Sequence, residues 1–138
     1  MFSFHALPLR YKCVDVYVQK CHEMADAIAK KANVRNYSVC FQSKMGFGRW
    51  TEPEISDHLK ELIVEEKRRV LLMAPGFIVD CLETVGDFKK YRFDFISSGG
   101  EELRYVGALN DFQPWVTSVA QHVTTKIGNN CEEKRLLG

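Results

Sequence analysis

Apolar and polar residues alternate along this chain in a pattern that predicts short strands separated by helices. Short apolar stretches occupy residues 2–4, 37–42, 70–74 and 103–107, and proline, glycine or polar residues bound them. Between and after these stretches, apolar residues recur three and four positions apart, which is the spacing of a helix packed on one face. The helices are expected over 17–32, from a capping box at 51–54 through 63, from 80 to the glycines at 99–100, and over 112–127.

Strands that alternate with helices in this way predict an α/β fold with a parallel sheet. We expect a flavodoxin-like, doubly wound, four-stranded sheet with helices on both faces. The strand at 70–74 is continuously apolar, which indicates that both of its faces are covered. A single domain is predicted over residues 1–128. The charged residues that follow, 129–138, are expected to form a flexible tail.

Composition excludes several classes of protein but does not identify a function. The chain has 138 residues, of which 46% are hydrophobic and 27% charged, and its net charge of +1 gives no overall attraction to nucleic acid. Its five cysteines are scattered without a C-x-x-C pair, which argues against a disulfide framework or a zinc site and favours the cytoplasm. The longest apolar run, 70–79, is too short for a membrane span, and no signal peptide is visible. A peripheral contact with the inner membrane stays open.

Candidate chemistry should gather where strands end, because ligands of such sheets bind outside the carboxyl ends of the strands. None of these segments has the glycine spacing of a nucleotide-binding loop. His5 is the one histidine of four at a predicted strand end, where imidazole can accept a proton or bind a metal. The alternative is a loop histidine with no chemical role.

Carboxylates and aromatic residues near the same edge each have two interpretations. Asp80, Glu83 and Asp87 lie at the start of a predicted helix, where Asp80 as N-cap with Glu83 reaching back would be ordinary capping. The same carboxylates could instead receive protons or a hard cation. Trp50 and Phe77 are core residues by default, but a flat hydrophobic ligand would also gather them around one cleft.

The strand-end segments taken together resemble the carboxyl-terminal half of ferrochelatase. The matching motifs, in chain order, are Ser3-Phe-His-Ala-Leu-Pro8, Phe41-Gln-Ser-Lys44 followed by Trp50, Pro75-Gly-Phe77 with Asp80-Cys-Leu-Glu-Thr84, and Gly99-Gly-Glu-Glu102 with Leu109-Asn110. The resemblance implies a lyase of haem biosynthesis that inserts ferrous iron into protoporphyrin IX to form protohaem. It also implies two flavodoxin-like halves with the porphyrin in the cleft between them.

The resemblance assigns roles residue by residue. His5 matches the active-site histidine, which abstracts pyrrole protons or binds the metal, and Glu83 matches its acidic partner across the macrocycle. His5 and Glu83 are therefore the expected catalytic residues, and Asp87, which continues an acidic row, joins them as an expected metal ligand. Residues expected to line or support the porphyrin pocket are Ser3, Leu7, Pro8, Trp50, Phe77 and Asp80.

The chain also departs from the family pattern. Tyr91 stands where the acidic row would continue, which puts a conduit for protons or metal in doubt. Only Cys131 lies where animal members bind an iron–sulfur cluster, so we expect no cluster and no permanently bound cofactor, with iron as a substrate. The amino-terminal half of the pattern is absent, which favours a fragment or short form. A complementary amino-terminal half, a homodimeric chelatase for another metal, and a non-catalytic porphyrin-binding domain remain alternatives.

Overall fold

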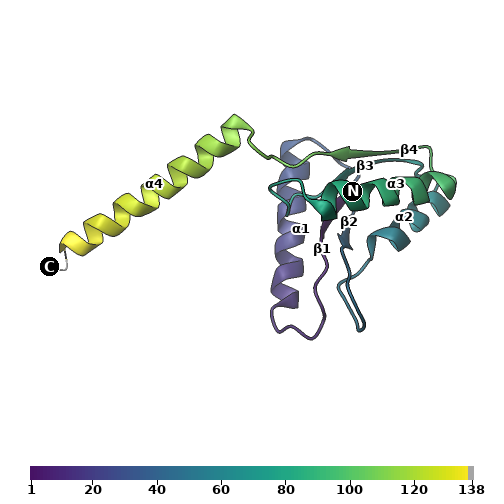
Figure 1. Ribbon diagram of the computed structural model, residues 1–138, viewed down its shortest axis with the longest axis horizontal. Helices are drawn as coiled ribbons and strands as arrows, with labels where there is room; N and C mark the ends of the chain where they lie inside the picture. Colours follow the sequence, from purple (N-terminus) through teal and green to yellow (C-terminus); the bar gives the residue numbers. More distant parts are fainter. Residues whose placement is uncertain (137–138) are drawn as a thin grey trace. The chain divides into compact units, whose positions relative to one another are not determined.

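The structure is a computed structural model that describes the backbone of residues 1–136 and the side chains of residues 1–127. Four strands alternate with helices along the chain (Figure 1). The strands are β1 (Phe2–His5), β2 (Val39–Gln42), β3 (Arg69–Met73) and β4 (Glu102–Val106). The helices are α1 (Val14–Lys31), α2 (Ile55–Val64), the short π-helix η1 (Leu82–Gly86), α3 (Asp87–Ser97) and α4 (Gln113–Leu136).

The strands form one parallel sheet in the order β2-β1-β3-β4. This order confirms the predicted α/β, flavodoxin-like architecture. In the register of β1 on β2, His5 lies directly opposite Gln42, so the last residues of these two strands are neighbours. All four strands end at the same edge of the sheet, as parallel strands must.

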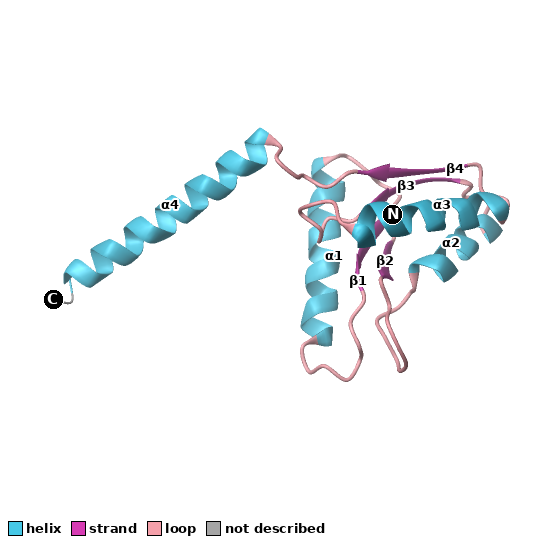
Figure 2. Ribbon diagram, viewed as in Figure 1, coloured by secondary structure: helices cyan, strands magenta, loops and turns pink. Residues whose placement is uncertain are grey.

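Helices cover both faces of the sheet, each with its own apolar core (Figure 2). On one face, α1 places small side chains, including Ala25 and Ala29, against Phe2, Phe4 and Phe41. The small side chains let the helix approach the aromatic strand residues closely. On the other face, α2 and α3 lie side by side over the strands. Their buried residues are Ile55, Leu59, Leu62, Tyr91 and Phe95.

Two predicted details of the sheet and of α2 are wrong. Val70 and Leu72 of β3 are buried, but the side of the strand that carries Leu71 is open, with that residue 56% exposed. The expectation that both faces of this strand are covered therefore fails. The N-cap of α2 is Glu54, whose carboxylate accepts hydrogen bonds from the backbone N–H groups of Ser56 and Asp57. Thr51 is not the cap.

The segment predicted as one helix from residue 80 contains two. The first turn is the π-helix η1, and α3 starts only at Asp87. Cys81 occupies the N-cap position, and its backbone N–H donates to the Thr84 hydroxyl oxygen at 2.9 Å. The capping interpretation of Asp80 and Glu83 is thus wrong, because the capping partner is Thr84. The predicted glycine stop is confirmed by Gly99, which follows the C-cap Ser98 with φ +106°.

The chain divides into two compact units, Met1–Ala108 and Leu109–Gly138. The second contains α4, which continues past residues 128–130, where the sequence pattern predicts its end. That predicted helix end is wrong. The expected flexible tail, 129–138, and Cys131 lie outside the described side chains. Within residues 1–136, no helix is both long enough and apolar enough to cross a bilayer.

Candidate active site

His5 is the last residue of β1, and two hydrogen bonds fix its position. Its Nδ1 lies 2.7 Å from the backbone carbonyl oxygen of Ala6. Because a carbonyl oxygen only accepts, Nδ1 carries the proton that is donated, and in the neutral imidazole Nε2 keeps a free lone pair. The hydroxyl of Tyr17, on α1, donates to the His5 backbone carbonyl at 2.7 Å. His5 is therefore held in place with its basic nitrogen, Nε2, free to accept a proton.

Glu83 reaches the same place from the π-helix. One of its carboxylate oxygens, Oε1, lies 3.6 Å from Nε2 of His5, and each side chain is 42% exposed. The two residues are 78 positions apart in the sequence and meet at the carboxyl edge of the sheet. A proton acceptor and a carboxylate thus face one another at a separation that a proton or a cation can bridge. No macrocycle fits between atoms 3.6 Å apart, so the expectation that Glu83 lies across the macrocycle from His5 is wrong.

Asp87 does not complete a metal centre with this pair. It is the first residue of α3, and its charge acts on Tyr91: burial raises the pKa of the Tyr91 hydroxyl, and the carboxylates of Asp87 and Glu54 raise it further. Among the described side chains, no group of three or more histidine, cysteine, aspartate or glutamate residues could hold a metal ion. Of the three expected metal ligands, the structure brings His5 and Glu83 together.

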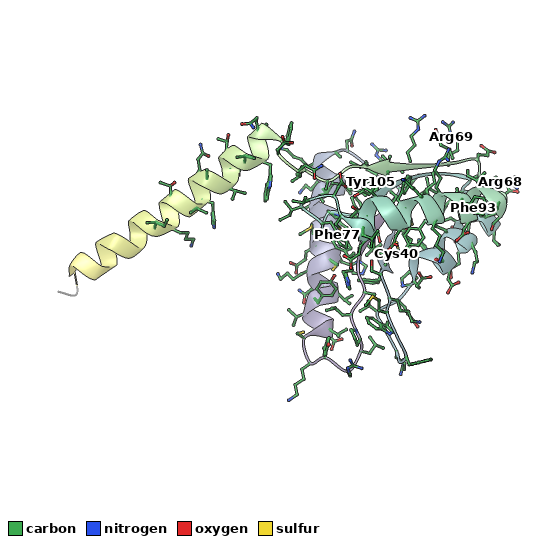
Figure 3. The ribbon with its side chains drawn as sticks, viewed as in Figure 1. Cys40, Arg68, Arg69, Phe77, Phe93 and Tyr105 are labelled. Atoms are coloured by element: carbon green, nitrogen blue, oxygen red, sulfur yellow. The ribbon has the colours of Figure 1, made fainter. Side chains whose placement is uncertain are left out.

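An apolar cavity of ≈ 210 Å³ opens beside His5. Phe77, from the loop after β3, forms one wall and is labelled in Figure 3. Its ring centre lies 6.3 Å from that of His5, with 37° between the ring planes. Gly76 from the same loop also lines the cavity, and β1 and α1 contribute residues that include Phe4, Tyr17, Cys21 and Met24. The site therefore combines a basic nitrogen with a predominantly apolar wall, which suits an aromatic ligand.

Comparison with known proteins identifies the family of this chain. The sequence model of the ferrochelatase family matches residues 1–127. The chain belongs to the ferrochelatase family. Curated relatives named ferrochelatase include those of Dechloromonas aromatica, 34% identical over 93% of this chain and 36% of the relative, and Pseudomonas aeruginosa, 38% identical over 76% and 32%. The ferrochelatase of a Janthinobacterium species is 36% identical over 88% of this chain and 34% of the relative. The chain spans about a third of the length of these relatives.

Within this ferrochelatase family member, the loop that follows His5 is tied to the loop that precedes α2. Pro8 and Trp50 form an isolated antiparallel bridge, and the Leu7 backbone N–H donates to the Thr51 hydroxyl oxygen at 3.1 Å. Trp50 packs against the core on the α1 face, with its indole nitrogen buried. These contacts hold the loop that follows His5 against the loop that precedes α2. Ser3 is completely buried within β1 and has no exposed surface for a ligand.

Asp80 joins the start of the π-helix to the end of β4. Its Oδ1 accepts hydrogen bonds from the hydroxyls of Thr84 and Tyr105, at 3.3 and 3.2 Å, and from the Ala108 backbone N–H at 3.2 Å. Tyr105 is labelled in Figure 3. Burial raises the pKa of this tyrosine, so its hydroxyl keeps the proton that it donates. Asp80 thereby supports the segment that carries Glu83.

Replacing Asp80 by alanine is expected to lower the free energy of unfolding by about 1–2 kcal/mol, because the Tyr105 hydroxyl and the Ala108 N–H lose their acceptor in a half-buried position. The Thr84 hydroxyl keeps the Cys81 backbone carbonyl as an acceptor, at 3.1 Å. Asp80→Asn keeps one oxygen at the same place and should lose less. Thermal unfolding followed by circular dichroism measures both. Equal melting temperatures for Asp80→Ala and the wild type would show that these hydrogen bonds add no stability.

Three functional contacts were not predicted from the sequence. The sequence places Tyr17 only on the apolar stripe of its helix, and Thr84 and Gln42 only within motifs of the family resemblance. Each acts through a hydrogen bond between a side chain and a distant or nearby backbone group. A single sequence carries no periodic signal for such contacts, although Thr84 and Gln42 lie in the motifs near the strand ends.

Proposed function

We propose that this chain supplies the His5–Glu83 side of a ferrochelatase site and takes part in inserting ferrous iron into protoporphyrin IX to form protohaem. Membership of the family supports the reaction class. The observation that carries the assignment is the pairing of His5 Nε2 with the Glu83 carboxylate at 3.6 Å. Iron is a substrate in this proposal, and no resident cofactor is required.

The chemistry needs an acceptor for protons. Metalation replaces two pyrrole N–H protons by a divalent ion, so a base must take each proton as the metal enters. His5 can do so at Nε2, since its Nδ1 proton is committed to Ala6. The imidazolium formed is then stabilised by the nearby Glu83 carboxylate. Both side chains are partly exposed, which leaves a route for protons to leave to solvent.

Binding energy must also distort the macrocycle, because a planar porphyrin hides its nitrogens from an approaching ion. Phe77 and the apolar cavity beside His5 offer contact surface for one face of the ring system. The opposing wall is supplied by a complementary amino-terminal half or by a second copy of this chain. In either assembly, the protein acts in the cytoplasm with a peripheral contact to the membrane.

The test is anaerobic incubation of the chain with ferrous iron and protoporphyrin IX, followed by the visible absorption spectrum. Glu83→Gln keeps the shape of the side chain and removes its charge, so we expect the rate to fall at least about tenfold. Glu101→Gln, an exposed change elsewhere on the same unit, is the matched control and should match the wild type. Metalation by the wild type no faster than by Glu83→Gln would overturn the catalytic proposal.

Two further measurements separate the alternatives. Quenching of porphyrin fluorescence by a chain that does not metalate would identify a porphyrin-binding domain without catalysis. Size-exclusion chromatography with light scattering determines the oligomeric state, and a strictly monomeric chain at working concentration would eliminate the homodimeric chelatase. Metalation that appears only after an amino-terminal ferrochelatase half is added would identify the complementary half as the partner.

A further inference from the structure

Gln42 is a buried amide between the two functional side chains. It is the last residue of β2, only 2% exposed, and lies opposite His5 in the register of the sheet. A polar side chain at such a position is costly unless its groups are hydrogen-bonded. The contacts that it makes therefore indicate why an amide occupies the end of this strand.

Gln42 makes one hydrogen bond toward each side of the site. Its backbone carbonyl accepts from the N–H of Ala6 at 2.8 Å, and Ala6 is the residue whose carbonyl holds the His5 ring. Its side-chain Nε2 donates to the backbone carbonyl of Glu83 at 2.5 Å, across 41 positions of sequence. Since the Glu83 carbonyl can only accept, the orientation of the Gln42 amide is fixed.

We propose that Gln42 is a positioning residue that sets the separation between His5 Nε2 and the Glu83 carboxylate. The π-helix that carries Glu83 follows a loop and is tied toward β4 through Asp80 and Thr84. The Gln42 amide ties it toward β2, on the side where His5 lies. Without the Gln42 donor, the hydrogen bonds described above would tie this segment only toward β4.

The catalytic meaning of this role rests on the proposed function, whereas the geometric role does not. A displacement of about 1 Å in a reacting group can reduce a rate by about 10²-fold. Gln42 makes no described side-chain contact with His5 itself, so its effect acts through the backbone of the two residues that it holds. A change at Gln42 should therefore alter the rate of metalation more than porphyrin binding.

The test variant is Gln42→Met, which keeps much of the volume and removes the donor. Gln19→Met is the matched control, because Gln19 makes only an exposed hydrogen bond to Glu23 on α1. Nuclear Overhauser contacts between the His5 ring and the Glu83 side-chain protons report their proximity. We expect these contacts in the wild type and in Gln19→Met, and their loss in Gln42→Met while the rest of the spectrum stays folded.

A second measurement uses the wild type, so that the proposal stays testable if Gln42→Met fails to fold. The side-chain amide protons of Gln42 should exchange with solvent at least about tenfold more slowly than those of Gln19. Equal exchange rates, or unchanged His5–Glu83 contacts in a folded Gln42→Met, would each overturn the proposal.

Metalation kinetics then connect the geometry to the reaction. If the wild type is active, Gln42→Met should lower kcat at least about tenfold and leave the KM for porphyrin unchanged. A variant with unchanged kcat would refute the positioning role. Because the magnetic resonance measurements require no activity, an inactive wild type would contradict only the proposed function and leave the assignment of Gln42 to be decided by its own data.

Discussion

Replacing His5 by alanine is expected to slow iron insertion by about 10²- to 10⁴-fold, the usual contribution of a general base. The variant removes His5 Nε2, which lies 3.6 Å from the Glu83 carboxylate with its lone pair free. Porphyrin binding should be largely kept, because the apolar wall formed by Phe77 and its neighbours is untouched. The anaerobic absorbance assay measures the rate, and fluorescence quenching measures binding.

His22→Ala is the control for this experiment, since His22 lies exposed on α1 and does not line the cavity beside His5. Its rate should equal that of the wild type. Free imidazole added to His5→Ala should restore part of the rate if the lost group is a base. A His5→Ala protein that metalates at the wild-type rate would remove His5 from the mechanism.

Gly100→Ala is expected to produce a larger loss of stability than alanine at any other glycine whose surroundings the structure describes. A Cβ at this position would lie within 2.8 Å of three ring atoms of Phe95. That ring is 2% exposed and belongs to the core beneath α2 and α3, so it has little room to move. Overpacking should cost about 2 kcal/mol and lower Tm by roughly 8 °C.

Gly107→Ala provides the comparison, because the nearest atom to its added Cβ is Asp80 Oδ2 at 3.6 Å, an ordinary contact. Thermal unfolding should separate the two variants clearly. Equal melting temperatures would show that Phe95 can shift to accept the methyl group, and that the core on this face is less tightly packed than its burial indicates.

The alternation of strands and helices was predictable because each element buries an apolar face with its own periodicity. The sequence pattern predicted that His5 and residues 80–87 lie at the same edge of the sheet, but it did not predict which side chain of that segment faces His5. Parallel strands bring their carboxyl ends to one edge, but spacing alone favoured a capping role for Asp80 and Glu83. The Thr84 hydroxyl fills that role, which leaves Glu83 to face His5.

The π-helix could not be predicted from the sequence. Tertiary contacts hold its first residues, with Asp80 toward β4 and Gln42 toward β2, and no local pattern distinguishes it from an α-helix. Gly86 is the last residue of the π-helix, and a Cβ at this position would lie 2.7 Å from Leu82 Cδ1, so the glycine suits the turn.

The pairing of His5 with Gln42 in adjacent strands has a consequence for how this protein can tolerate change. Successive side chains of a strand point to opposite faces, so a slip of one residue between β1 and β2 would turn His5 away from Glu83. The relative position of His5 and Glu83 therefore depends on the backbone hydrogen bonds between β1 and β2. Substitutions that loosen the packing of Phe4 or Phe41 beneath α1 should therefore reduce turnover before they unfold the domain.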